Sequence, residues 1–132
     1  MKKLLSSLFI LIPFAIFAQT QFQNTIGNST NERNYQIATL RDGSLVATGY
    51  TNAVSGNKND AYLIKFNQFG EVDWAKTYGD SEDDYTWDIE VTANNQIIAG
   101  GLTNSFGTPS TAGTLTRTDS AGNVQWLAGV YT

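Results

Sequence analysis

An internal repeat of 52 residues constrains this chain more than any other feature of its sequence. Residues 22–73 align with residues 74–125 without a gap, and Phe22, Trp74 and Trp126 mark three successive registers. Identical pairs are spread along the whole unit and include Thr25/Thr77, Gly27/Gly79, Ser29/Ser81, Ile37/Ile89, Ala47/Ala99, Gly49/Gly101, Thr51/Thr103, Asn52/Asn104, Leu63/Leu115, Gly70/Gly122 and Val72/Val124. Two homologous units of this length predict two similar supersecondary structures that stack on each other.

Each unit is predicted to form four short β-strands. Short apolar segments end in turn residues such as Asp42-Gly43 and Asn94-Asn95, and no long helical stripe of apolar residues appears. The strands are expected at 35–39, 44–51, 61–67 and 72–78, and in the second unit at 86–92, 96–103, 113–119 and 124–131. Four strands per unit are typical of a propeller blade, so the predicted fold class is all-β: two four-stranded antiparallel propeller-type blades, a partial β-propeller.

The second strand of each unit is predicted to be covered on both faces. Residues 45–47 and 97–99 are apolar in succession rather than alternating with polar residues. This pattern favours sheets that stack face to face over a single sheet with one wet side.

Residues 1–18 are predicted to be a signal peptide. Lys2 and Lys3 precede an apolar run from Leu4 to Ala18, and a polar stretch follows at Gln19. The run is shorter than the roughly 20 residues that a membrane-spanning helix needs, which favours a signal over an anchor. The mature chain, residues 19–132, is therefore expected to have no membrane span and to be secreted or held at the cell surface as one partial β-propeller, with residues 126–132 starting a further repeat.

Charge and composition exclude several function classes. Loss of Lys2 and Lys3 takes the formal net charge from −4 to −6, and an acidic chain is a poor ligand for nucleic acid. The sequence contains neither Cys nor His. Disulfides, zinc sites of the Cys/His kind, and nucleophilic catalysis that uses a Cys or a His base are therefore excluded.

An acidic segment at residues 79–84 is the densest cluster of oxygen ligands. Asp80, Glu82 and Asp84 could together hold Ca²⁺, although their spacing is not that of an EF-hand. A solvated turn with side chains capping backbone amides is the alternative. No other cofactor is expected.

Four carboxylates raise the alternative of glycoside hydrolysis. Asp83, Asp84, Asp88 and Glu90 could supply the two carboxyl groups of such an enzyme. An acid and a base need distinct environments, however, and Asp88 and Glu90 alternate with Trp87 and Ile89 as solvent-facing strand residues would. The interpretation that we prefer is therefore a chain without catalytic residues.

Aromatic residues offer a candidate ligand-binding surface. Trp74 and Trp126 recur at the repeat spacing, which indicates a structural role. Tyr85 and Trp87 are not duplicated in kind and are the better candidates for ligand binding, with core packing as the alternative. The loops at 52–59 and 104–112 differ most between the units, and recognition tends to sit on such loops.

The segment from Asp60 to Gly79 resembles the bacterial secreted β-propeller repeat family, which is common in exported proteins of Bacteroidetes-type bacteria. The shared pattern is an Asp, an apolar strand with a Lys, a Gly turn, a Trp, an acidic Gly-containing loop, and a strand that ends Gly-Tyr-Thr, here residues 49–51. The second unit departs from it at Ala112 and Arg117. The resemblance implies a propeller fold and export, and it implies no particular reaction.

Two blades are fewer than the four to eight that close a propeller. Three outcomes stay open: a fragment of a longer protein, a ring assembled from several copies, or two sheets packed as a small independent domain. The expected function is a secreted, non-catalytic scaffold or a module that binds a ligand or glycan at the cell surface. A carbohydrate-active enzyme fragment and a purely structural adhesive repeat are the alternatives. Expected partners are further blades of the same chain or other copies, and a glycan or surface protein.

Overall fold

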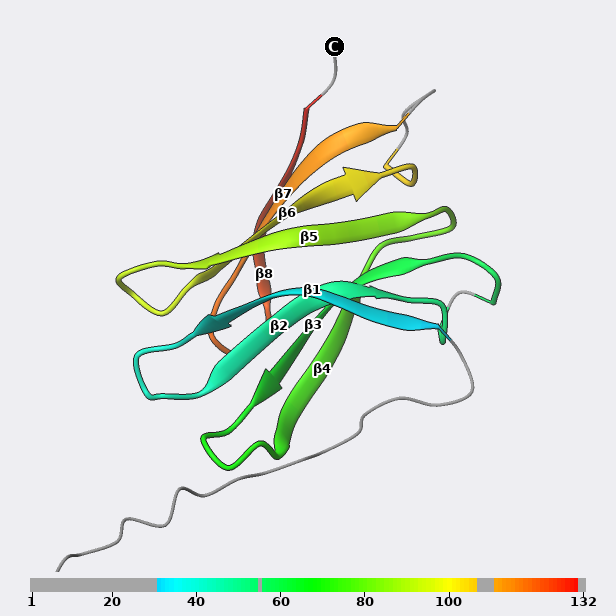
Figure 1. Ribbon diagram of the computed structural model, residues 1–132. Coiled ribbons are helices and arrows are strands. Elements are labelled where there is room, and N and C mark those ends of the chain that lie inside the picture. Colours follow the sequence, from blue (N-terminus) through cyan, green and yellow to red (C-terminus); the bar gives the residue numbers. More distant parts are fainter. Residues whose placement is uncertain (1–30, 55, 107–110, 131–132) are drawn as a thin grey trace, which may run out of the picture.

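The computed structural model describes residues 31–54, 56–106 and 111–130, which form eight strands in two antiparallel sheets (Figure 1). The first sheet has the order β1-β2-β3-β4 and the second the order β5-β6-β7-β8. The first consists of β1 (Glu32–Thr39), β2 (Leu45–Thr51), β3 (Asp60–Phe66) and β4 (Val72–Tyr78). The second consists of β5 (Asp84–Val91), β6 (Ile97–Thr103), β7 (Ala112–Thr118) and β8 (Val124–Val130). No helix forms among these residues, so the predicted all-β class is confirmed.

The repeat is reproduced strand for strand. Every strand of the second sheet begins and ends 52 residues after its counterpart in the first. The pairing register follows the same offset, with Glu32 opposite Thr51 in one sheet and Asp84 opposite Thr103 in the other. Eight strands were predicted at nearly these bounds, but β1 and β5 each begin earlier than expected, because their polar first residues continue the ladder to the end of the neighbouring strand.

The turn between the third and fourth strands is built in the same way in both sheets. The Oδ1 atom of Asn67 accepts hydrogen bonds from the backbone amides of Phe69 and Glu71. In the second sheet Asp119 takes this role and accepts from Ala121 and Asn123. The Asn123 amide in particular holds the pKa of Asp119 below its usual value.

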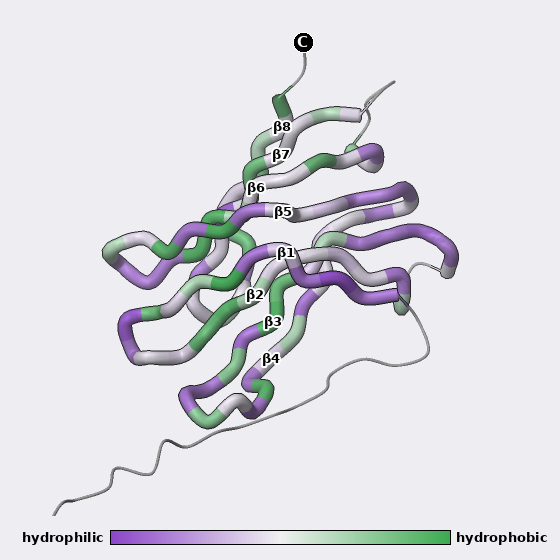
Figure 2. The backbone as a smooth tube through the Cα atoms, viewed as in Figure 1, coloured by the Kyte–Doolittle hydropathy of each residue, from purple (hydrophilic) through white to green (hydrophobic). Residues whose placement is uncertain are grey.

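The two sheets stack face to face through β5, which contacts β1, β2 and β3 of the first sheet. We call the face of the first sheet that meets the second its rear face; it carries Val46 and Leu63. The face of the second sheet that meets it is that sheet's front face, with Ile89, Ile97 and Ala99, and these five residues belong to one core cluster. Figure 2 shows hydrophobic segments along β2 and β3.

A second, smaller cluster lies on the opposite, front face of the first sheet. It consists of Ala47, Tyr62 and Ile64, with Phe66 packed against them. The predicted two-sided covering of the second strand is thus confirmed in β2, where Val46 is 0 % and Ala47 4 % exposed. In β6 only one face is buried: Ile97 is 0 % exposed, whereas Ile98 is partly exposed on the rear face. The reason is that no described strand lies against the rear of the second sheet.

Two threonines link the sheets inside this interface. The hydroxyl of Thr48 donates to Thr86 Oγ1 at 2.6 Å, and the hydroxyl of Thr86 donates to the carbonyl oxygen of Gly49 at 2.8 Å. Both side chains are buried, at 0 % and 4 % exposed. The pair therefore fixes the register of one sheet on the other with directional bonds.

The predicted signal peptide at residues 1–18 lies outside the described residues, as do residues 19–30 and the start of a further repeat at 131–132. The described residues contain no helix that is long and apolar enough to cross a membrane.

Replacing Thr86 by Val should lower the free energy of unfolding by about 1–3 kcal/mol, because Thr48 and Gly49 each lose a buried partner. Urea titration of Thr86→Val, of Thr48→Val and of the double variant gives the coupling free energy between the two side chains. Additive losses would show that the hydroxyls do not act as a pair.

Replacing Asp119 by Asn should make stability less sensitive to acid. The folded-state pKa of Asp119 is lowered, so its contribution is present above the unfolded value of about 3.9 and is lost as pH falls through the lower folded value. The difference in unfolding free energy between wild type and Asp119→Asn should therefore narrow as pH falls from 6 to 2. The reciprocal variant Asn67→Asp should gain acid sensitivity; parallel pH profiles for all three proteins would contradict this account.

Candidate ligand-binding site

A β-bulge interrupts the first strand of each sheet at the same place. In β1 the pairing with β2 shifts between Asn34 and Gln36, and in β5 the pairing with β6 shifts between Thr86 and Asp88. The residue left over in each case is aromatic, Tyr35 in one sheet and its counterpart Trp87 in the other. Bulges re-aim side chains, and both of these residues are 46 % exposed.

Glycine opposite each bulge makes this geometry feasible. A Cβ atom on Gly49 would lie 1.7 Å from the carbonyl oxygen of Arg33, and one on Gly101 would lie 1.8 Å from that of Tyr85. No side chain fits at such distances, so the bulged strand can approach its neighbour only over glycine. The repeated glycines of the sequence are thus explained by the bulges rather than by strand bending alone.

The two bulge residues end a continuous row of four aromatic rings, which we call the aromatic row: Tyr35, Tyr50, Tyr85 and Trp87. The ring centroids of Tyr35 and Tyr50 are 6.0 Å apart. Those of Tyr50 and Tyr85 are 5.2 Å apart in an edge-to-face contact, and Trp87 is stacked at 6.5 Å from Tyr85. The row crosses from the first sheet to the second, with β1 and β5 next to each other (Figure 1).

The centre of the aromatic row is held by polar contacts. The side-chain amide of Asn59 donates to the Tyr85 hydroxyl at 2.9 Å and to Asp83 Oδ1 at 3.0 Å. Tyr50 and Tyr85 are half-buried, whereas the two end residues project into solvent. Of the predicted ligand-binding pair, Trp87 is thus an exposed end of the row and Tyr85 a support beneath it. Tyr35 was missed, although the 52-residue offset from Trp87 points to it, and Tyr50 was considered but not preferred.

The three residues of the calcium hypothesis have different partners. Both oxygens of Asp84 are hydrogen-bonded, Oδ1 to the Thr103 hydroxyl and Oδ2 to the Ser105 hydroxyl, and Oδ2 also accepts from the Asp80 amide. Glu82 is paired with Lys58 at 2.6 Å. No group of three acidic side chains that could hold a metal ion is found in the described part of the chain. The calcium hypothesis stays a prediction, while the geometry gives Asp84 a structural role.

The four carboxylates considered for hydrolysis are divided among separate surroundings. Asp83 accepts from the amide and side chain of Asn59, and Asp84 is buried in the hydroxyl contacts just described. Asp88 and Glu90 are exposed, as predicted, and Asp88 accepts from the neighbouring Ile89 amide. The arrangement supports turn and strand ends and does not place a carboxyl pair around a cleft.

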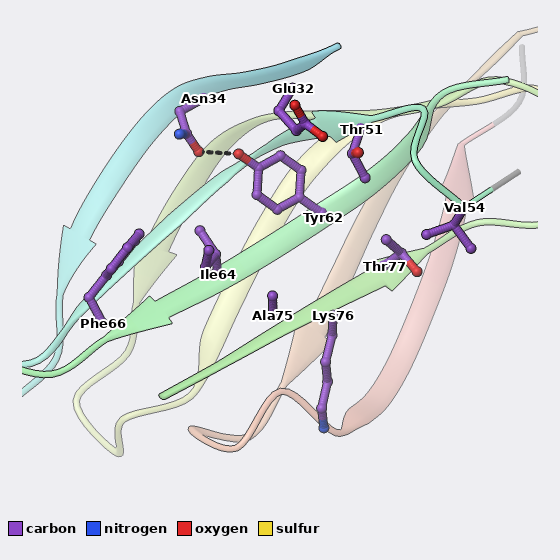
Figure 3. A pocket seen from close by; sticks show the side chains of 10 residues that line it. All are labelled: Glu32, Asn34, Thr51, Val54, Tyr62, Ile64, Phe66, Ala75, Lys76 and Thr77. Carbon is purple, nitrogen blue, oxygen red and sulfur yellow. Dashed lines mark hydrogen bonds between the residues drawn. The ribbon is translucent and has the colours of Figure 1, made fainter. Parts of the chain in front are cut away.

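A groove of about 530 Å³ lies on the front face of the first sheet, and sequence reasoning did not find it. Tyr62, Ile64 and Phe66 stand side by side along β3 within it (Figure 3). The Tyr62 hydroxyl donates to Asn34 Oδ1, and burial raises the pKa of this tyrosine. The groove is largely apolar in its centre, which suits protein surface better than a small charged ligand.

Comparison with known proteins gives no assignment. No protein-family model matches the chain, and no curated protein matches it significantly. The resemblance to secreted propeller repeats therefore stays a prediction from the sequence.

Replacing Gly101 by Ala should lower the unfolding free energy by about 2 kcal/mol or more, because the new methyl group would collide with the Tyr85 carbonyl and open the bulge. Gly113→Ala is a matched control on the adjacent strand, since its Cβ would meet only Val130 at an ordinary 3.9 Å. Denaturant midpoints of the two variants provide the measurement. Equal stability of the two would show that the bulge tolerates a side chain.

Proposed function

We propose that this chain is an exported, non-catalytic β-propeller-type repeat module that binds carbohydrate through the aromatic row. The observation that carries the proposal is the placing of Tyr35 and Trp87, two half-exposed rings held by matching bulges at the ends of one connected row. The predicted signal peptide at residues 1–18 supports export.

The propeller-type interpretation is supported by how the sheets are built and stacked. Each sheet is a four-stranded meander in chain order, and the first strand of the second sheet packs against the first sheet. Radial repetition of such sheets is the propeller architecture, and a closed propeller has at least four of them. In this arrangement β1 and β5 would face the central axis, so the aromatic row would line the region where propellers present ligands.

Carbohydrate suits the aromatic row for chemical reasons. An aromatic face is apolar and polarisable, and it can stack on the C–H face of a sugar ring, while phenol and indole groups hydrogen-bond to hydroxyls. Rigid aromatic side chains also lose little conformational entropy on binding. The neighbouring Asn59 and Asp83 supply polar groups at the edge of the row, although their bonds to each other and to Tyr85 make them supports first.

A non-catalytic role is supported by the state of the carboxylates. Catalytic acid–base pairs need free carboxyl oxygens on both sides of a substrate. Oδ1 of Asp83 instead accepts from the backbone and side-chain amides of Asn59, and both oxygens of Asp84 accept from hydroxyls or a backbone amide. We therefore expect Asp84→Asn to lower the free energy of unfolding without changing the affinity for glycan.

Trp87→Ala should weaken glycan binding at least tenfold, because it removes an exposed stacking face without touching the core. The assay is a glycan array on residues 19–132, followed by calorimetric titration with the oligosaccharide that binds best. Phe69→Ala, which removes a 60 % exposed aromatic residue in the β3–β4 turn, is the matched control and should bind normally.

Three results would refute this function. Binding that survives both Trp87→Ala and Tyr35→Ala would place the glycan elsewhere, and no binding to any glycan would leave a structural repeat. Release of new reducing ends during incubation would instead identify an enzyme. Thermal melting of each variant checks that lost binding is not lost folding.

A further inference from the structure

The chain carries both halves of an interface that it forms once within itself. Inside the molecule the rear face of the first sheet packs on the front face of the second. The front face of the first sheet and the rear face of the second remain, and no described strand packs on either. Each of these remaining faces is the repeat counterpart of one that is already paired.

The rear face of the second sheet is open and apolar. Leu115 is 44 %, Trp126 39 % and Val130 59 % exposed. Their counterparts in the first sheet are Leu63, Trp74 and Tyr78, of which Leu63 is buried in the core and the other two pack against it. The same positions are therefore covered in one sheet and bare in the other.

The front face of the first sheet and the rear face of the second differ in side-chain size from their counterparts inside the molecule. The front face has larger side chains than its counterpart, and the rear face has smaller ones. On the front faces, the first sheet has Tyr62, Ile64 and Phe66 where the second has only threonine. The threonines, Thr114, Thr116 and Thr118, leave room for the rear face of the first sheet, and Tyr78 lines the space beside Thr114 and Thr116. Along the third strand, the front face of the first sheet is thus the bulkier one.

On the rear faces the change runs the other way. At four positions the side chain of the first sheet is larger than its counterpart in the second: Thr48/Gly100, Tyr50/Leu102, Lys76/Ala128 and Tyr78/Val130. A rear face with large residues meets a front face of threonines inside the molecule. A rear face with small residues is left to meet a front face of Tyr, Ile and Phe, which fits because interfaces need complementary volumes.

We propose that the rear face of the second sheet docks on the front face of the first sheet of a second copy of this chain. Trp126 would be the anchor. Its counterpart Trp74 packs against Gly122, where an added Cβ would lie 2.9 Å from the indole ring. Gly70 is the same residue of the first sheet, with φ of 80° against 75° at Gly122, so the two turns have the same backbone conformation.

This docking is weaker than the contact within the chain. The internal interface includes hydrogen bonds from Lys76 Nζ to Asn123 and from the Tyr78 hydroxyl to the Gly122 carbonyl, both at 2.8 Å. At the corresponding positions of the new interface stand Ala128 and Val130, which donate nothing. Association is therefore apolar and depends on protein concentration.

A contact between two different faces propagates head to tail and stops only when a ring closes. Each copy contributes two sheets, and propellers close with four to eight, so the ring should contain two to four copies. A closed ring pairs the rear face of every second sheet with the front face of a first sheet, whereas an open chain leaves one such pair of faces unpaired, which favours rings.

Sedimentation velocity of residues 19–132 over a range of concentrations tests the proposal. The wild-type chain should reach a discrete species of two to four copies. Trp126→Ala should weaken association at least tenfold, and Val130→Lys should do the same by placing a charge in the apolar face. Leu127→Ala removes a 38 % exposed apolar side chain from the opposite face of β8 and should assemble normally.

Several results would overturn the proposal. A monomer at every concentration would do so. The front face of the first sheet would then be covered by further repeats, by another protein or by residues 21–27. Residues 21–27 are a candidate because Phe22, Thr25 and Gly27 are the repeat counterparts of Trp74, Thr77 and Gly79. Assembly that is unchanged in both Trp126→Ala and Val130→Lys would place the interface elsewhere. Circular dichroism shows that each variant keeps its sheets.

Discussion

The packing of β5 on the first sheet is the contact on which the rest of this structure depends. A four-stranded sheet exposes two broad faces, and neither of these sheets could bury enough apolar surface alone. Ile89 and Ile97 enter the same core as Val46 and Leu63, and the Thr48–Thr86 hydroxyl pair sets the relative register. Without this contact Tyr50 would not reach Tyr85, and the aromatic row would be two separate pairs.

Much of this fold was accessible from the sequence because the repeat is ungapped. The turn residues of one unit mark the ends of its strands, and the ungapped alignment transfers these ends to the other unit. All eight strands were therefore located within a few residues. The burial of β2 on both faces followed from three successive apolar residues. In β6 the same pattern misled, because Ile98 faces a side that only a partner outside the described residues could cover.

The candidate site was less accessible. Tyr85 and Trp87 were chosen because they differ from their counterparts, yet Trp87 owes its exposure to a bulge that it shares with Tyr35. A bulge depends on how two strands pair, so the sequence gives only a weak signal for it, here the glycines at 49 and 101. The partners of the acidic segment were not predicted either: Asp84 accepts from the Thr103 hydroxyl and Glu82 pairs with the Lys58 ammonium group, and both partners are about 20 residues away in the chain.

The recurrence of the bulge at a fixed interval has a further consequence. Each unit carries an exposed aromatic ring at the same position of its first strand, Tyr35 or Trp87, so any assembly of units displays a regular array of similar contact points. If the aromatic row binds sugars as proposed, such an array favours polymers over monosaccharides, because successive sugars can engage successive units and avidity grows without a change in any single contact. Adding units would then tune the retention of a long polysaccharide while leaving the chemistry of each contact unaltered.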